Sequence, residues 1–167
     1  MKLKLAGTRL LEQDAAMEVL GKLPKLEILL LPWSSFQGQE LAFKSPQAGI
    51  SFGSLRVLVF FVESRFKSVK FEEGTMPKVE VLFLRGDVVD NEFCFSGLEF
   101  LPSINEVQLH VYFPWDEERI KAAPDFKTRA KLREEVKQEQ APKRGELKKK
   151  IQDQLFRCAN EPIVVVE

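Results

Sequence analysis

Residues 76–86 read MPKVEVLFLRG, and nearly the same phrase occurs earlier as LPKLEILLLPW at residues 23–33. In both phrases a proline precedes alternating apolar residues, as in a short strand with one buried face. The pattern L-x-x-L-x-L recurs four times and begins a fifth time, at Leu26/Leu29/Leu31, Leu55/Leu58/Phe60, Val79/Leu82/Leu84, Ile104/Val107/Leu109 and, in part, Leu3/Leu5. Matching positions from Leu3 to Val107 are 26, 29, 24 and 25 residues apart, within the length range of leucine-rich repeats. The spacing therefore predicts an α/β leucine-rich-repeat solenoid whose parallel strands form a concave face.

The segments between these strands should return along the outer side of the solenoid. We expect a helix in the first return, capped by Asp14, with apolar side chains from Met17, Val19, Leu20 and Leu23. Residues 34–49, SSFQGQELAFKSPQAG, suggest a loose polar loop, and residues 64–75 suggest either a short outer strand or an extra abbreviated repeat. In the fourth return, we expect core side chains from Phe93, Phe95, Leu98 and Leu101. Leu23 and Met76 should fill the core before their strands, and Pro24 and Pro77 should mark the turns into them.

The composition changes after Phe113. Residues 116–157 carry 13 basic and 9 acidic residues, a net charge of +4, although the whole chain has a formal charge of zero. The pattern predicts three helices, opened by Asp116, by Asp125 and near Lys143, with the second ending at about Gln140. The final EPIVVVE should form a short strand over the last repeat, because an open end would expose the solenoid core. We therefore divide the chain into repeats at 1–113 (about four plus a partial first) and a helical cap at 114–167.

No catalytic, metal or cofactor pattern stands out. His110 is the only histidine, and Cys94 and Cys158 have no metal-binding spacing, so we expect neither an enzyme nor a cofactor. The lysine run 148–150 permits nucleic-acid binding, but it fits the solvated face of a helix better. The longest apolar run, residues 57–62, is too short to span a bilayer, and the N-terminus lacks a signal peptide. We expect a cytoplasmic protein with no membrane contact and no small-molecule substrate.

The outward positions of the predicted strands are unusually apolar. Alternation places one column at Lys4, Leu30, Val59, Phe83 and Gln108, the next at Ala6, Pro32, Phe61, Arg85 and His110, with Trp33 and Val62 beyond them. A patch holding leucine, valine and two phenylalanines is rare on a soluble monomer, so a protein surface should cover it. The candidate partner-binding residues are Leu30, Trp33, Val59, Phe61, Phe83, Arg85, Gln108 and His110. A register shifted by one residue would instead bury them.

These phrases resemble a known family. FEEGTMPKVEVLFL at 71–84 resembles the F-x-x-G-x-M-P-x-L-E-x-L-x-L signature of plant disease-resistance receptors, the nucleotide-binding leucine-rich-repeat (NLR) proteins, and the coiled-coil subclass of cereals is most similar. SFGSLRVLVFF at 51–61 and LPSINEVQLHVYF at 101–113 are similar to their repeats, and RCANEPIVVVE at 157–167 is similar to their ends. The chain lacks the coiled-coil and nucleotide-binding domains of that family, and it has no P-loop that would bind ATP or ADP.

The resemblance implies a non-catalytic interaction module, the C-terminal repeats of an immune receptor. Its partner would be a pathogen effector or the receptor's own nucleotide-binding domain, so that it would serve effector recognition and autoinhibition in plant defence. An alternative is a stand-alone truncated regulator or decoy that pairs with full-length receptors through the same face. A third, weaker alternative is nucleic-acid binding by the basic tail helices, which would depend steeply on salt. Whether Met1 is the true start stays open.

Overall fold

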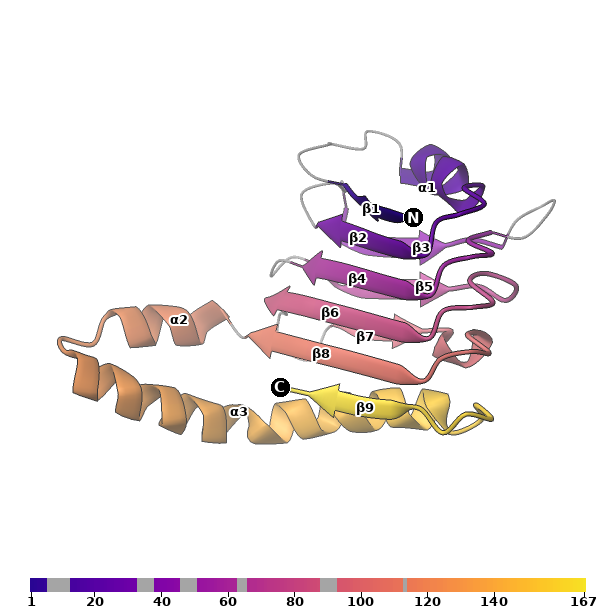
Figure 1. Ribbon diagram of the computed structural model, residues 1–167. Helices are drawn as coiled ribbons and strands as arrows, with labels where there is room; N and C mark the ends of the chain where they lie inside the picture. Colours follow the sequence, from indigo (N-terminus) through magenta and orange to yellow (C-terminus); the bar gives the residue numbers. More distant parts are fainter. Residues whose placement is uncertain (6–12, 33–37, 46–50, 63–65, 88–92, 113) are drawn as a thin grey trace.

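The computed structural model describes residues 1–5, 13–32, 38–45, 51–62, 66–87, 93–112 and 114–167. In this part of the chain the strands form two parallel sheets, one behind the other, whose strands run in opposite directions (Figure 1). Successive strands alternate between the two sheets through much of the chain, so the backbone winds as a solenoid. The predicted parallel-stranded solenoid followed by helices is therefore confirmed.

The larger sheet contains the strands that the repeated phrase predicts. Its strands, in spatial order, are β1 (Lys2–Lys4), β2 (Ile28–Pro32), β4 (Val57–Val62), β6 (Val81–Asp87), β8 (Glu106–Tyr112) and β9 (Ile163–Val166). Every neighbouring pair is parallel, and the register aligns the matching positions Leu3, Leu29, Leu58, Leu82, Val107 and Val164. From Leu29 to Val107 these side chains are fully buried, as the alternation predicts.

The turns before the strands also repeat. Four turns share one backbone hydrogen bond, 3.1–3.4 Å long, in which the first apolar residue of the L-x-x-L-x-L pattern donates its N–H to the carbonyl three residues before it. The donor and acceptor pairs are Leu26–Leu23, Leu55–Phe52, Val79–Met76 and Ile104–Leu101. Pro24 and Pro77 occupy the second position of such turns, where a fixed φ is favourable. Met76 is fully buried, which confirms its predicted place in the core, whereas Leu23 is half-buried.

Polar side chains link successive turns. The hydroxyls of Ser54 and Ser103 donate to the carbonyls of Pro24 and Pro77, each at 2.7 Å, and the Asn160 amide donates to the Pro102 carbonyl at 3.1 Å. These bonds satisfy the carbonyls that the turns leave without a ladder partner. The same kind of contact therefore links the first turn to the second, the third to the fourth, and the fourth to the C-terminal segment.

The smaller sheet shows that the expected loop at residues 34–49 is wrong, and it decides between the two readings of residues 64–75. It consists of β3 (Glu40–Phe43), β5 (Ser68–Phe71) and β7 (Cys94–Ser96), all parallel. The predicted loose loop at 34–49 thus contains a strand, because Leu41 and Phe43 alternate inward and are buried. In residues 64–75 the described part forms an outer strand, the first of the two readings of that segment. The rings of Phe43, Phe71 and Phe95 stack along this sheet, with centroids 5.3 and 6.5 Å apart, so three of the fourteen phenylalanines form one buried row.

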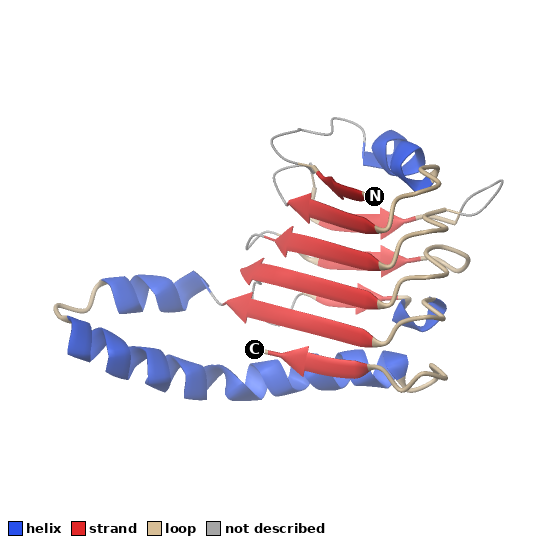
Figure 2. Ribbon diagram, in the orientation of Figure 1, coloured by secondary structure: helices blue, strands red, loops and turns tan. Residues whose placement is uncertain are grey.

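Helices lie at both ends of the stack (Figure 2). Helix α1 (Gln13–Gly21) lies at the β1 end and buries Met17 and Leu20 in the core, while Val19, expected on the apolar side, is exposed. The helix begins at Gln13, so Asp14 lies inside it and the prediction that Asp14 caps it is wrong. The 3-10 turn η2 (Leu98–Phe100) follows β7 and buries Leu98, as predicted.

The C-terminal segment has two helices where three were expected. Helix α2 (Pro114–Lys121) begins two residues before Asp116, and helix α3 (Phe126–Leu155) runs on through Pro142. Pro142 removes one helix donor and its ring crowds the preceding turn, at a cost of about 3 kcal/mol, and buried Ile151 and Leu155 hold the part beyond it against the solenoid. Asp125 caps α3 as predicted, since its carboxylate accepts the Thr128 backbone N–H at 2.8 Å. Helix α3 contacts β7, η2 and β9, so it closes this end of the core.

Candidate protein-interaction face

The outward face of the six-stranded sheet is the strongest candidate site. Its core consists of apolar side chains from β2, β4 and β6, which we call the open face: Ile28, Leu30, Pro32, Val57, Val59, Phe61, Val81 and Phe83. The parallel register lines them up across the strands, so that Leu30, Val59 and Phe83 are direct neighbours. These side chains are half-buried, apart from Phe61 at 36% exposure. In Figures 1 and 2, no described helix lies in front of this side of the sheet.

The structure brings most of the predicted contact residues together. The pairs Pro32–Phe61, Phe61–Arg85 and Arg85–His110 are aligned across the sheet, as are Val59–Phe83 and Phe83–Gln108. Trp33 lies outside the described residues, so its predicted place is untested. The predicted register is confirmed, and the alternative register shifted by one residue is wrong.

One expected member of this surface is misplaced. Val62 is only 7% exposed and belongs to the core, because it shares the inward parity of Leu58 and Phe60. The column Ile28, Val57 and Val81 was missed, although these residues are directly paired and half-buried on the same side as Phe83. The same alternation that located Leu30 and Val59 also predicts this column, which lies two residues earlier in each strand.

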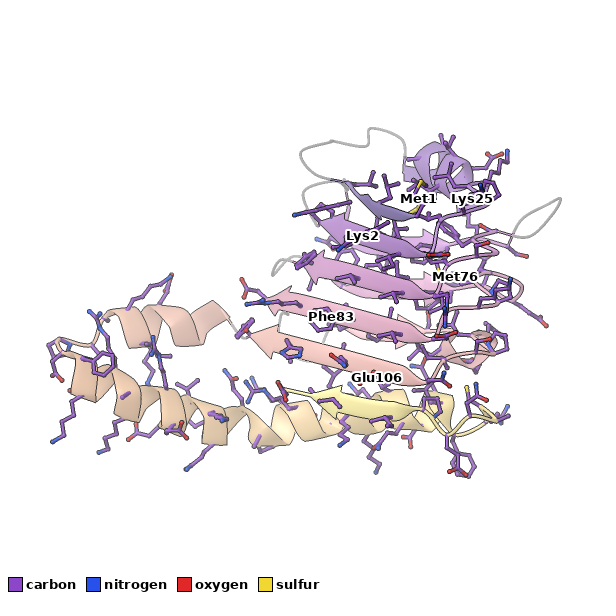
Figure 3. The ribbon with its side chains drawn as sticks, in the orientation of Figure 1. Met1, Lys2, Lys25, Met76, Phe83 and Glu106 are labelled. Carbon is purple, nitrogen blue, oxygen red and sulfur yellow. The ribbon has the colours of Figure 1, made fainter. Side chains whose placement is uncertain are left out.

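Charged and polar side chains lie on the strands next to the open face, β1 and β8, and beyond β8 the strand β9 places Ile163 and Val165 on the same face. Lys2 and Lys4 of β1 are exposed on one side, and Glu106, Gln108 and His110 of β8 lie on the other. Figure 3 shows Lys2, Phe83 and Glu106 on the same side of the sheet. An apolar centre with a polar rim is the usual composition of a protein–protein interface.

The β8 edge is held in place by side-chain contacts. The Gln108 amide donates to a Glu106 carboxylate oxygen at 2.6 Å, and the His110 Nδ1 atom lies 3.4 Å from a Glu167 carboxylate oxygen. The His110 ring also packs on Phe83, with centroids 5.1 Å apart. Glu167 and Phe83 orient the His110 imidazole beside the apolar centre. None of Gln108, Glu167 and Phe83 is a nucleophile of the serine or cysteine type. The arrangement suits a rigid contact surface.

Other kinds of site have little support in the described part of the chain. Within it, no group of three or more histidine, cysteine or acidic side chains is arranged to hold a metal ion. Its helices also include none with the length and apolar character needed to cross a membrane. Cys94 is exposed on the second sheet, whereas Cys158 is half-buried, and burial together with the charge of Glu99 raises the pKa of the Cys158 thiol.

Fold and surface together define a parallel-stranded solenoid with a helical end cap and one exposed apolar sheet face. Comparisons of the chain with protein-family models, with curated proteins and with solved structures gave no match. The function is therefore argued from the residues themselves and from the resemblance of the repeated phrases.

Proposed function

We propose that this chain is a protein-interaction module, and that it corresponds to the C-terminal leucine-rich repeats of a plant intracellular immune receptor of the coiled-coil NLR class. The proposal rests on the repeated phrase with its 24–29-residue spacing, on the strands that it forms, and on the resemblance of residues 71–84 to the receptor signature. In this proposal the module is non-catalytic and acts in the cytoplasm.

The open face is the observation that supports protein binding. Parallel sheets are normally covered on both faces, but here one face packs on the core and the other presents eight aligned apolar residues. Solenoid proteins commonly use such an extended sheet surface to hold a partner. Phe61 and Phe83 offer the largest apolar side chains on the face, and rigid aromatic groups at the centre of an interface contribute most to affinity.

The partner in this proposal is either a pathogen effector or the receptor's own nucleotide-binding domain. Either would meet the same apolar centre and the same rim of Lys2 and Lys4 on one side and Glu106 on the other. If the chain exists alone, it would act as a regulator or decoy that pairs with full-length receptors. An antibody to residues 143–157 distinguishes these arrangements on a blot of host tissue. A band near 19.2 kDa supports the stand-alone form, and a band several times larger supports a whole receptor.

The test of the face is the double variant Phe61→Glu/Phe83→Glu. We would express the chain fused to a biotin ligase in cereal leaf protoplasts, and identify the labelled neighbours by mass spectrometry. The matched control is Ser68→Glu/Ser96→Glu, which adds the same two charges to the outer side of the second sheet. Far-UV circular dichroism and thermal unfolding of the purified proteins must show that both variants fold.

We expect the face variant to lose the specific neighbours and the control to keep them. For a neighbour that is then purified, two central aromatic contacts worth about 2 kcal/mol each should weaken Kd by at least a hundredfold. Normal binding by a folded face variant would refute the assignment of the open face. Loss of binding in the control as well would show a general effect of charge.

A further inference from the structure

A second surface lies at the C-terminal ends of β8 and β9, beside helices α2 and α3. A cleft of about 740 Å³ separates the α2–α3 pair from the C-terminal ends of β8 and β9. Its walls come from both helices and both strands: Tyr112, Ile120, Lys121, Arg133, Val136, Lys137, Gln140, Arg144, Val166 and Glu167. The volume falls in the range of small-molecule sites, about 300–1,000 Å³. In Figure 1, the first half of α3 projects beyond the strands, with α2 alongside it.

One face of α3 provides most of the cleft wall. Arg133, Val136, Lys137, Gln140 and Arg144 are spaced at i, i+3, i+4, i+7 and i+11, which puts all five on one side of a helix. Lys121 joins them from the last turn of α2. The wall therefore carries four cationic side chains, and the side-chain carboxylate of Glu167, which itself lies near His110, is the acidic side chain among its lining residues.

The acidic residues of α3 do not neutralise this wall. Arg119 of α2 binds Glu139 at 2.9 Å and lies 4.0 Å from Glu135, which also lies 3.7 Å from Lys131. Across the described ranges, Arg133 and Lys137 form no salt bridge with any acidic side chain. The charges of Arg133 and Lys137 are thus left for a ligand.

Arg144 is oriented by a hydrogen bond within the helix. Its Nη2 atom donates to Gln140 Oε1 at 2.8 Å, and Gln140 is itself buried. The buried Nε atom has no acceptor among the residues that the structure describes. A guanidinium held by a buried amide is well oriented to bind an anionic group.

The remaining lining is apolar. Ile120, Val136 and Val166 line the cleft together with the ring of Tyr112, which is 45% exposed. A ligand in this cleft would therefore place an apolar body against these side chains and a negative charge against the cations of α3. Such a division of polarity selects an amphipathic molecule over a simple ion.

We propose that the cleft binds an amphipathic organic anion, with an aromatic or aliphatic body and a phosphate or carboxylate headgroup held by Arg133, Lys137 and Arg144. The assignment is independent of the open face, because none of the eight open-face residues lines the cleft. Nucleic acid is a poorer match, because its binding sites combine a charged groove with several stacking aromatic residues, and Tyr112 is the one aromatic side chain of this wall.

The test is isothermal titration of the full chain with three probes of one shape: 1-naphthyl phosphate, 1-naphthoic acid and the neutral 1-naphthalenemethanol. We expect at least one anion to bind at least tenfold more tightly than the neutral probe, a difference of about 1.4 kcal/mol. The preferred anion identifies the headgroup. Equal binding of all three probes, or no binding of the anions at millimolar concentration, would overturn the proposal.

Charge variants locate the site. Arg133→Gln/Lys137→Gln should weaken the preferred anion at least tenfold. The control Lys149→Gln/Lys150→Gln removes two exposed cations from the same helix outside the cleft, and should leave binding unchanged. Equal weakening by both pairs would show a non-specific charge effect and refute the site. If a glutamate-rich peptide binds more tightly than either anion and displaces it, the small-ligand proposal is wrong, and the cleft binds an acidic protein segment instead. The Phe61→Glu/Phe83→Glu variant should bind the anion normally, so the two proposals fail separately.

Discussion

Gly86 provides a sharp test of the solenoid backbone. It lies in β6 with φ at 141°, a conformation that side chains disfavour, and it pairs with Val62 of β4. A Cβ atom at this position would lie 1.9 Å from the Val62 carbonyl oxygen and 2.9 Å from its carbonyl carbon. Because these are backbone atoms at a strand pair, no side-chain rotation can relieve the contact. We predict that Gly86→Ala destabilises the whole solenoid.

Two other glycines separate the effect of backbone strain on stability from the effect of the close contact with Val62. Gly38 has a similar φ of 134°, but a Cβ atom added there would have no heavy atom within 4 Å, so Gly38→Ala should show only the backbone strain, about 2 kcal/mol. Gly145 lies inside α3 with equally open surroundings, so Gly145→Ala should stabilise the helix by about 0.5–1 kcal/mol. Gly86→Ala adds to the strain the loss of at least one ladder hydrogen bond, about 1 kcal/mol. We therefore expect a loss of about 3 kcal/mol.

The free energies of unfolding would be measured by urea denaturation, followed by circular dichroism at one protein concentration. From most to least stable, the expected order is Gly145→Ala, wild type, Gly38→Ala and Gly86→Ala. If Gly86→Ala were no less stable than Gly38→Ala, β4 and β6 would not approach as closely as described. If all three variants matched wild type, the argument from backbone conformation would be refuted.

Three further changes test the fold at single residues. Leu82→Ala should cost about 2–5 kcal/mol and its outward neighbour Phe83→Ala less than half as much, and equal losses in urea denaturation would contradict the register. Asp125→Ala should lower the thermal midpoint at pH 7, and Asp125→Asn should not. Because hydrogen bonds from Thr128 lower the pKa of Asp125, the difference in thermal midpoint between wild type and Asp125→Ala should fade as the pH drops below about 4. A difference that stays constant with pH would contradict the cap. Pro142→Ala restores a helix donor and should raise stability by roughly 1–3 kcal/mol, and an unchanged urea midpoint would contradict the continuous helix.

The larger sheet could be predicted almost completely from the sequence. Its strands repeat one phrase, and alternation alone assigns Leu82 to the core and Phe83 to the surface. The contact columns follow from the same rule, which is why most predicted site residues lie together. Val62 was misassigned only because it was grouped with Trp33 by position at the strand end, against its own parity.

The smaller sheet and the long helix were harder to predict. The strand β3 has four residues, and polar and glycine residues on either side gave residues 34–49 the composition of a loop. The spacing of Leu41 and Phe43 repeats in Val69 and Phe71, a signal that alignment of the returns would have revealed. Pro142 ended the predicted helix because a local rule cannot include the packing of Ile151 against the solenoid, which stabilises the segment beyond the proline.

The cleft could not be predicted, because it depends on where α3 lies relative to the strand ends. Its cationic stripe is readable as Arg133, Lys137 and Arg144 at helical spacing, but the lysine run 148–150 drew attention to a different part of the helix. A run of adjacent charges spreads around a helix, whereas residues four and seven apart converge on one side. Spacing is therefore a better guide than local charge density to where a helix concentrates its charge.

Strand β9 connects the two proposed surfaces. Val165 lies opposite Gln108 in the central column of the large sheet, while the next residue, Val166, lines the cleft. Because neighbouring residues of a strand point to opposite faces, one short segment contributes to both sites and also covers the edge of β8. Disruption of β9 should therefore impair both sites and expose the end of the core. Only substitutions whose side chains lie on one side, such as Phe83 or Lys137, can show which surface binds which ligand.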